Sequence, residues 1–177
     1  MLIAPLKSQI TKDIEITFSK DDVIVSRTDV RGIITYCNKI FMSISGYEER
    51  ELLGKPHSLL RHPDMPKAVF KLLWDYVSSG QEIFAYVKNL CKTGEYYWVI
   101  AHITPSYNEN DELIGYHSNR RMPNRGAVQT ISEVYRNMLS IEKAAPTTKV
   151  GIEESLKYLH NLISENGNDY NEYVLKI

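Results

Sequence analysis

The chain has 177 residues, a formal net charge of −1 at pH 7, 43% hydrophobic residues and 24% charged residues. This length suits one domain with a full core and an appendage, and the charge gives no electrostatic attraction to nucleic acid or to an anionic membrane. The only two cysteines, Cys37 and Cys91, stand in strand-like stretches and do not suggest a disulfide framework. With no secretory signal and no run of about 18 apolar residues, the sequence predicts a cytoplasmic protein that neither binds nucleic acid nor inserts into a membrane.

The first half of the chain predicts a hairpin followed by short helices. Residues 23–28 are apolar and β-branched, and a turn separates them from a second strand at 32–37. Asn38 then opens a helix that Gly46 ends. Another short helix follows at residues 48–53.

The loop at residues 56–66 gathers charged and imidazole side chains among prolines. It places His57, Arg61, His62 and Asp64 close together, just before a helical run. Prolines remove donors and fix φ, so this stretch is not the interior of a regular helix. Arg61 offers planar donors for a phosphate or carboxylate, and His62 and Asp64 can hydrogen-bond a polar ring or a ribose. A structural role fits equally well, with Asp64 capping the next helix and Arg61 in solvent.

The second half of the domain predicts one longer helix and three strands. Residues 66–79 place their apolar positions on one broad face, and Gly80 ends the helix. Strands follow at 83–91, 96–104 and 112–121, and a proline ends the second of them. Five strands with helices on one side make an α+β domain with a pocket between sheet and helices.

Alternation along the strands predicts which side chains face the pocket. The pocket wall is expected to contain Ile83, Ala85, Val87 and Asn89. Among these apolar neighbours, the Asn89 carboxamide needs a polar partner. The outer face, a candidate docking surface for a partner, is expected to present Trp98, Ile100 and His102. On the last strand the pocket side is expected to carry Gly115, His117 and Asn119.

Five motifs between residues 22 and 122 stand out. They are Asn38-x-x-Phe41-x-x-x-Ser45-Gly46-Tyr47, Glu51-Leu52-x-Gly54-x-Pro56-His57, Arg61-His62-Pro63-Asp64-Met65-Pro66, Val87-Lys88-Asn89 and Lys92-x-Gly94-x-x-Tyr97-Trp98-Val99. Together they resemble a PAS domain, specifically that of bacterial aerotaxis and energy-taxis receptors. The third motif is the most specific of the five.

The resemblance implies a PAS fold with a five-stranded antiparallel sheet in the order 2-1-5-4-3. It also implies a non-covalently bound FAD and a redox-sensing role that steers swimming. The residues that it places at the cofactor are Arg61, His62, Asp64, Trp74, Asn89, Asn38 and His57. Asn89 would hydrogen-bond the isoalloxazine edge, and Trp74 would pack close to the cofactor or stiffen its helix. FAD brings a pyrophosphate, a ribose and a polar ring edge, which the 56–66 loop suits.

Two features depart from the family. Ile83 stands where family receptors carry a tryptophan, so one flavin contact is missing. Family receptors also continue into a membrane anchor and a methyl-accepting rod. This chain resembles instead the stand-alone PAS partner of bipartite energy-taxis systems. The expected partner is a membrane-bound chemoreceptor or signalling protein, through which the chain would associate with the membrane, and a homodimer is the alternative assembly.

The sequence divides into a leader at 1–21, the PAS sensor domain at 22–122 and a C-terminal part that is expected to couple sensing to output. Residues 127–165 carry two apolar stripes separated by a break near Pro146. The two predicted helices either form an antiparallel hairpin on the outer face of the sheet or pair with helices of a partner. Residues 166–177 are predicted to be a flexible tail.

Two other functions fit the pattern. A haem-binding PAS gas sensor would draw its axial ligand from His57, His62, His102 and His117. A ligand-free interaction module would fill its pocket with tyrosine and isoleucine side chains. Catalysis is not expected, because no nucleophile is paired with a base. Blue-light photochemistry of the LOV type is not expected either, because the central loop has no cysteine.

His117 is the predicted redox relay. In the related LOV domains the matching strand position is a glutamine beside flavin N5, and the resemblance suggests that His117 stands there. A histidine titrates near physiological pH and can exchange a proton or a hydrogen bond with N5 on reduction. The alternatives are that His117 fills the core with its nitrogens satisfied, or points outward after a one-residue bulge.

Overall fold

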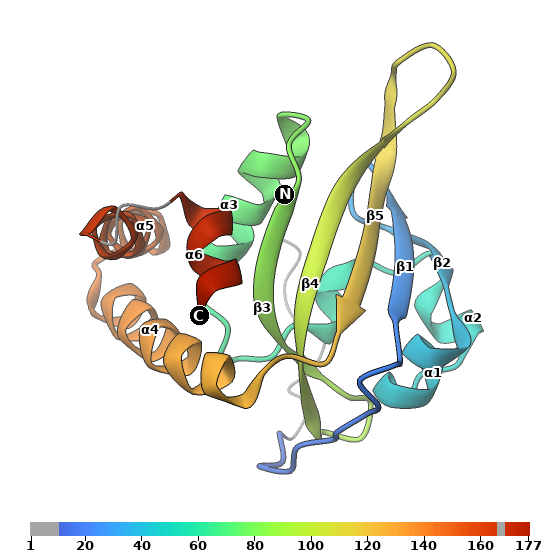
Figure 1. Ribbon diagram of the computed structural model, residues 1–177, viewed down its shortest axis with the longest axis horizontal. Coiled ribbons are helices and arrows are strands. Elements are labelled where there is room, and N and C mark those ends of the chain that lie inside the picture. Colours follow the sequence, from blue (N-terminus) through green and yellow to red (C-terminus); the bar gives the residue numbers. More distant parts are fainter. Residues whose placement is uncertain (1–10, 166–168) are drawn as a thin grey trace.

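The computed structural model describes residues 11–165 and 169–177, which form one antiparallel sheet flanked by helices (Figure 1). The strand order β2-β1-β5-β4-β3 confirms the prediction. The strands are β1 (Ile24–Asp29), β2 (Ile34–Cys37), β3 (Ile83–Leu90), β4 (Tyr96–Tyr107) and β5 (Leu113–Arg121). The helices are α1 (Lys39–Ser45), α2 (Glu49–Leu52), the 3-10 helix η1 (His57–Leu60), α3 (Lys67–Ser78), α4 (Arg125–Ala144), α5 (Thr148–Glu165) and α6 (Tyr170–Lys176).

Local sequence accounts for both ends of α1. The carboxamide oxygen of Asn38 accepts the backbone N–H of Phe41 at 3.0 Å, which caps the helix. Gly46 ends the helix with a φ of 74°, a left-handed conformation that glycine adopts without a Cβ penalty. Both boundaries agree with the sequence prediction.

Strand β4 is longer than the sequence predicted. It runs through Pro105 to Tyr107, three residues beyond the expected end at Thr104. Beyond Ile103, β3 no longer lies beside β4, and β5 continues as its neighbour. A proline is tolerated in such an edge stretch because not every backbone donor there needs a ladder partner.

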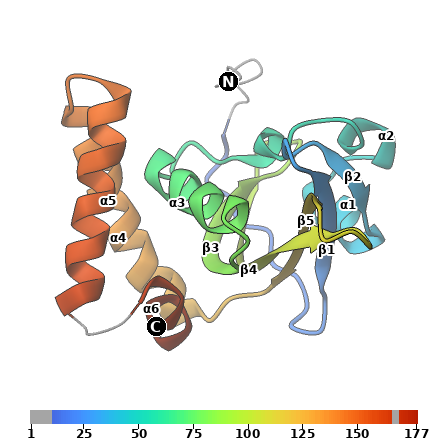
Figure 2. The same ribbon diagram turned by 90° about the horizontal axis from the view of Figure 1, so that it is seen from above.

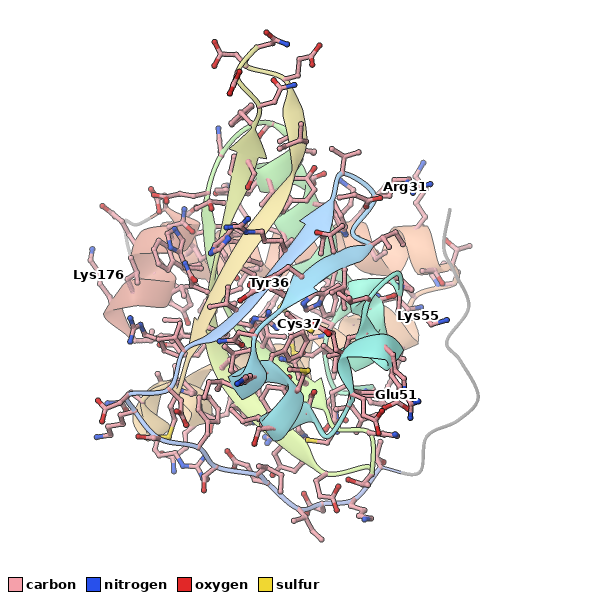
Figure 3. The ribbon with its side chains drawn as sticks, turned by 90° about the vertical axis from the view of Figure 1, so that its right-hand side faces the viewer. Arg31, Tyr36, Cys37, Glu51, Lys55 and Lys176 are labelled. Atoms are coloured by element: carbon pink, nitrogen blue, oxygen red, sulfur yellow. The ribbon has the colours of Figure 1, made fainter. Side chains whose placement is uncertain are left out.

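The edge of the sheet at β2 is covered by the segment between α2 and η1. The Ile34 N–H donates to the Lys55 carbonyl, and the His57 N–H donates to the Gly32 carbonyl, both at 2.9 Å. Figure 3 looks onto this edge, with Tyr36 on β2 and Lys55 on the covering segment. These bonds fix His57 at the margin of the sheet, from where its ring reaches the interior.

The opposite edge, at β3, is covered by side chains from the C-terminal helices. The Phe84 N–H donates to the Asn171 carboxamide oxygen at 2.9 Å, and the Tyr135 hydroxyl donates to the Tyr86 carbonyl at 2.8 Å. A covered edge no longer offers a template for pairing with another chain.

The pairing register shows which side chains face α1 and α3. Across β3 and β4, Asn89 lies opposite Tyr97 and Ala85 opposite Ala101, so the predicted pocket wall does share the inner face. Across β4 and β5, Ala101 lies opposite Arg120. The inner face of β5 therefore carries Tyr116, Ser118 and Arg120.

The predicted pocket-side position of His117 was wrong. Its register partner is the outer-face residue Thr104. On that face, Arg27 Nε donates to His117 Nδ1 at 3.4 Å, and His117 Nε2 lies 3.1 Å from Asn119 Oδ1. Gly115, His117 and Asn119 were all predicted on the pocket side, and all three belong to the outer face, so the whole strand was assigned the wrong way round.

Helices α4 and α5 form an antiparallel hairpin beside α3 and the β3 edge (Figures 1 and 2). The predicted position on the outer face of the sheet was therefore wrong, although α4 does reach outer-face Trp98, on which Tyr135 stacks at 6.4 Å between ring centroids. Helix α4 lies at this edge, where its Tyr135 hydroxyl satisfies the backbone carbonyl of Tyr86 on β3.

The predicted flexible tail at 166–177 was wrong for its described part. Residues 170–176 form α6, whose Tyr170, Tyr173 and Val174 are buried. Residues 166–168 lie outside the described residues. Helix α6 is ordered because it packs beside β3, where its Asn171 also bonds the strand.

The described part of the leader runs along the start of β4. The Ile16 N–H donates to the Tyr96 carbonyl at 2.7 Å, and the Tyr96 N–H donates to the Ile14 carbonyl at 2.9 Å. Residues 1–10, the rest of this segment, lie outside the described residues. Across the described helices, none combines the length and apolar character that crossing a membrane requires.

Candidate cofactor site

The 56–66 loop lies along the β3 edge of the sheet. Arg61 forms a backbone bridge with Asn89, and Met65 Sδ accepts the Lys88 N–H at 3.3 Å. This arrangement brings together Arg61 and Asn89, two of the residues predicted to contact the cofactor.

The Arg61 guanidinium is held on an aromatic ring rather than in solvent. It lies over Phe70, 3.7 Å from the ring centroid. Burial lowers its pKa, and the nearby Glu142 carboxylate opposes that shift. Its Nε is buried and has no hydrogen-bond partner among the described residues. Arg61 therefore keeps a donor that a ligand can use.

Asp64 is turned towards the margin of the sheet, where it pairs with Lys88. The Lys88 Nζ lies 2.7 Å from Asp64 Oδ2 and 4.1 Å from the centroid of the Tyr96 ring. Burial by itself would raise the pKa of Asp64, but the hydrogen bond and the charge of Lys88 lower it below its usual value. The carboxylate predicted to contact the cofactor is thus already bound to a lysine, with its side chain 60% exposed.

His62 is buried and neutral. Its Nδ1 accepts the Asp64 N–H at 3.1 Å, and its ring meets Tyr96 edge-on. Burial and the Lys88 charge lower its pKa to about 4. In this neutral form Nδ1 is an acceptor occupied by the backbone, so the proton is on Nε2. His62 braces the loop, and Nε2 is its remaining donor.

The helix that follows the loop is capped from the C-terminal hairpin. Helix α3 begins after Pro66, which provides no side-chain cap. Instead, the Glu142 carboxylate on α4 accepts the N–H groups of Lys67 and Ala68 at 3.0 and 2.8 Å. A carboxylate at a helix N-terminus satisfies orphan donors and complements the helix dipole. The end of the loop is therefore tied directly to α4.

Three other predicted residues occupy different surroundings. Asn89 is buried on the inner face of β3. The Asn38 carboxamide accepts the Val25 N–H at 3.1 Å and donates to the Val23 carbonyl at 2.7 Å, besides capping α1, so it is committed to the fold. Trp74 is 36% exposed and meets Tyr116 edge-on at 5.4 Å. Trp74 thus closes the end of the interior near the β1–β2 turn.

Arg120 is a functional candidate that the sequence reasoning missed. It is 2% exposed on the inner face of β5, with its guanidinium 4.6 Å from the Phe41 ring centroid and its Nη2 on the Ser26 hydroxyl. Its Nε and Nη1 have no partner among the described residues. Burial lowers its pKa to about 10, so it remains charged at neutral pH. The strand parity of Tyr116, a large apolar residue, would have placed it correctly.

Two further polar side chains lie with Arg120 in the interior. His57 Nε2 is 3.3 Å from Ser26 Oγ, and the ring stacks on Phe41. Burial and the Arg120 charge lower the pKa of His57 to about 3. The Tyr97 hydroxyl is buried without a partner among the described residues, and burial raises its pKa. We call Arg120, His57, Tyr97 and Ser26 the Arg120 cluster.

The four histidines considered as haem ligands lie apart. His57 is inside, His62 is at the loop, and His117 is on the outer face. His102 is also on the outer face, where it stacks on Phe84 and lies 2.7 Å from Glu82. Of these residues, His57 alone belongs to the sheet interior, where its ring stacks on Phe41 and its Nε2 lies 3.3 Å from the Ser26 hydroxyl.

Comparison with known proteins agrees with this architecture. Residues 34–119 match the family model described as PAS fold. The aerotaxis receptor of Escherichia coli is 37% identical over 116 residues, which are 66% of this chain and 23% of the receptor. The chain carries a PAS domain of the aerotaxis-receptor type.

The chain is also similar to more distant proteins. The nitrogen fixation regulatory protein of Klebsiella pneumoniae is 28% identical over 136 residues, 75% of this chain and 27% of that protein. The chain thus spans about a quarter of the length of both curated relatives. A light-oxygen-voltage domain studied with a flavin analogue superposes with a TM-score of 0.54 at 20% identity, covering 65% of this chain and 86% of that one. At that identity the likeness concerns the fold.

Proposed function

We propose that this PAS protein binds FAD and senses cellular redox state in energy taxis, acting through contact with a partner and not through catalysis. The observation that carries the proposal is the 37% identity to an aerotaxis receptor across two-thirds of the chain. FAD, when bound, supplies a reversible electron acceptor. The chain itself binds and orients the cofactor and passes on a change in its surroundings.

The interior offers hydrogen-bond donors that suit a polar ring with carbonyl groups. Buried donors without partners among the described residues include Arg61 Nε, Tyr97 Oη, and Arg120 Nε and Nη1. Each needs an acceptor, and a flavin ring has several along one edge. Asn89, 4% exposed on the inner face, adds a carboxamide that can donate and accept.

Ile83 adjusts the expected strength of binding. It is fully buried on the inner face of β3, at the position where the family resemblance expects tryptophan. An isoleucine offers less ring surface for stacking than an indole. We therefore expect weaker FAD binding than in a receptor with tryptophan there, and Ile83→Trp should strengthen it.

The absorbance spectrum of the purified chain, before and after incubation with FAD, tests the proposal. A flavoprotein gives a two-band yellow spectrum, a haem protein gives a sharp Soret band, and a ligand-free module gives neither. Arg61→Ala and Asp64→Ala should both lower flavin occupancy. Asp64→Ala would act by releasing Lys88 from its ion pair at the loop. Exposed Arg31→Ala is the control and should leave it unchanged. A folded chain that takes up no flavin would overturn the FAD proposal.

One observation favours a second candidate, a ligand-free interaction module. The interior is packed by side chains such as Phe41, Leu60 and Tyr97, all fully buried. Flavin binding therefore requires these side chains to move, whereas an interaction module does not. Colourless protein that still binds its partner would identify the module.

We further propose that the partner is a separate membrane chemoreceptor, which would place the chain at the cytoplasmic side of the membrane. The outer face of the sheet supports this proposal, because Ile100 is partly exposed there with His102 beside it. Tyr135 already covers Trp98, so that residue is not part of the candidate docking surface. Sedimentation with membranes from cells that contain or lack chemoreceptors tests the proposal. Ile100→Glu should abolish receptor-dependent sedimentation, and exposed Lys149→Glu should not. Equal sedimentation with both membranes would contradict it.

A further inference from the structure

Arg120 is a buried cation without an anion. No ion pair joins it to a carboxylate in the part of the chain that the structure describes, and two of its three nitrogens have no partner there. A charge buried without an anion is strongly unfavourable. We expect a neutral residue at this position to give a more stable domain, which points to a role for the guanidinium beyond folding.

The groups around Arg120 do not provide the missing acceptor. The Ser26 hydroxyl is shared between Arg120 Nη2 and His57 Nε2. Phe41 offers the face of its ring. The Tyr97 hydroxyl, another buried donor, also has no partner among the described residues. A ligand that completes this arrangement must bring acceptors, and one that carries negative charge completes it best.

We propose that Arg120 binds the carbonyl-bearing edge of the flavin ring and favours the reduced, negatively charged form of that ring. This inference rests on the FAD binding proposed above. An oxidised ring that takes up two electrons and one proton carries one negative charge. A guanidinium in a low-dielectric interior stabilises that charge more than it stabilises the neutral oxidised ring.

The position of Arg120 suits this role in two ways. It projects from β5, the strand that leads into α4, so a change at the flavin reaches the hairpin through one strand. Its long side chain can also move away from Phe41 and so admit a flavin ring between the sheet and the helices. This movement breaks the cation–π contact between Arg120 and Phe41. Arg120 thus takes the relay position predicted for His117.

The midpoint potential of bound FAD tests the inference. Titration with dithionite in the presence of redox dyes supplies the electrons and reads the equilibrium. Arg120→Gln and Arg120→Met should each lower the potential by at least about 30 mV, a tenfold loss of preference for the reduced form in a two-electron couple. Arg120→Lys keeps the charge and should change it less. Arg121→Gln, next along β5 and exposed on the outer face, is the matched control and should leave it unchanged.

The outcomes separate the inference from the proposed function. If wild-type protein binds FAD and both neutral variants keep its potential, the role of Arg120 is overturned and FAD sensing stands. If wild-type protein binds no FAD, both are overturned. The methionine variant, which removes the buried charge and keeps an unbranched side chain, serves if the glutamine variant does not fold.

Discussion

The 56–66 loop and the Arg120 cluster differ in how their charges are paired. In the loop, Asp64 pairs with Lys88 at 2.7 Å, and the His62 ring accepts a backbone N–H. In the cluster, Arg120 contacts the Ser26 hydroxyl and an aromatic ring but no anion among the described residues. The loop is largely self-sufficient, whereas the cluster keeps unused donors.

The loop, which identifies the domain as a PAS domain, is therefore not the region that holds most of the free donors for a ligand among the described residues. The loop carries the motif by which the family is recognised, yet most of its polar groups support the backbone, β3 and the start of α3. The cluster has no motif in the sequence, because its residues come from β1, η1, β4 and β5. A site assembled from four separate elements is visible only once the register is known.

The largest expected effect concerns the pH dependence of stability, to which each region contributes one histidine. Burial lowers the pKa of His57 to about 3 and of His62 to about 4, compared with about 6.5 in an unfolded chain. The unfolded chain therefore binds two protons that the folded chain does not, and stability is lost as pH falls from about 6.5 towards these values. Between pH 7 and 5 the free energy of unfolding should fall by about 4 kcal/mol, about 2 from each histidine.

Urea unfolding at pH 7, 6 and 5 measures this slope. His57→Gln and His62→Gln should each remove about half of it, while His160→Gln on the exposed side of α5 should remove none. A free energy of unfolding that stays constant over this range would show that neither imidazole is held neutral by the fold.

The next largest effects are those of two arginine substitutions that should change the free energy of unfolding in opposite directions. In protein without FAD, Arg120→Met should raise the free energy of unfolding by about 1–3 kcal/mol, because it removes a buried charge whose donors are unsatisfied. Arg61→Met should lower it by about 1 kcal/mol, because Arg61, unlike Arg120, has a carboxylate nearby, and both the attraction of Glu142 and the cation–π contact with Phe70 are lost. Chemical denaturation compares the two, and destabilisation by Arg120→Met would mean that its charge is satisfied within the fold.

A smaller effect concerns the link between the loop and the C-terminal hairpin. Glu142→Ala removes the acceptor for the first two N–H groups of α3 and should cost about 1 kcal/mol of stability. Glu133→Ala, at an exposed position of the same helix, is the control. Amide NMR shifts at Lys67 and Ala68 should move in the first variant, and unchanged shifts would show that the cap is not formed.

The smallest effect is expected at the Asp64–Lys88 pair. Because the Asp64 side chain is 60% exposed, Lys88→Met should cost less than about 1 kcal/mol, and added salt should reduce the difference further. It should also raise the pKa of Asp64, which the lysine holds low. Carboxyl NMR titration measures this shift, and a cost well above 1 kcal/mol would place the pair among the strongly buried ones.

The family resemblance implied the strand order. The sequence itself predicted the helix boundaries and the residues of the loop, because caps, glycine stops and alternation are local signals. It assigned the faces of β5 wrongly, since alternation gives parity but not its origin, and glycine carries no side chain to show a face. Arg120 was overlooked for that reason. The position of the hairpin and the order of α6 depend on hydrogen bonds to backbone groups of β3 and of the start of α3. Those groups are far away in the sequence, so only the assembled fold reveals the bonds.

The NMR signal of the Arg120 Nε–H during FAD addition, assigned with Arg120→Lys, tests whether the flavin ring binds this guanidinium. We expect this resonance to move strongly and to saturate with one equivalent of FAD, because the ring supplies the acceptor that the fold lacks. The Arg61 Nε–H should respond too, since it is also without a partner, whereas that of exposed Arg31 should not. An Arg120 signal that stays in place while FAD binds would show that the flavin ring does not bind Arg120.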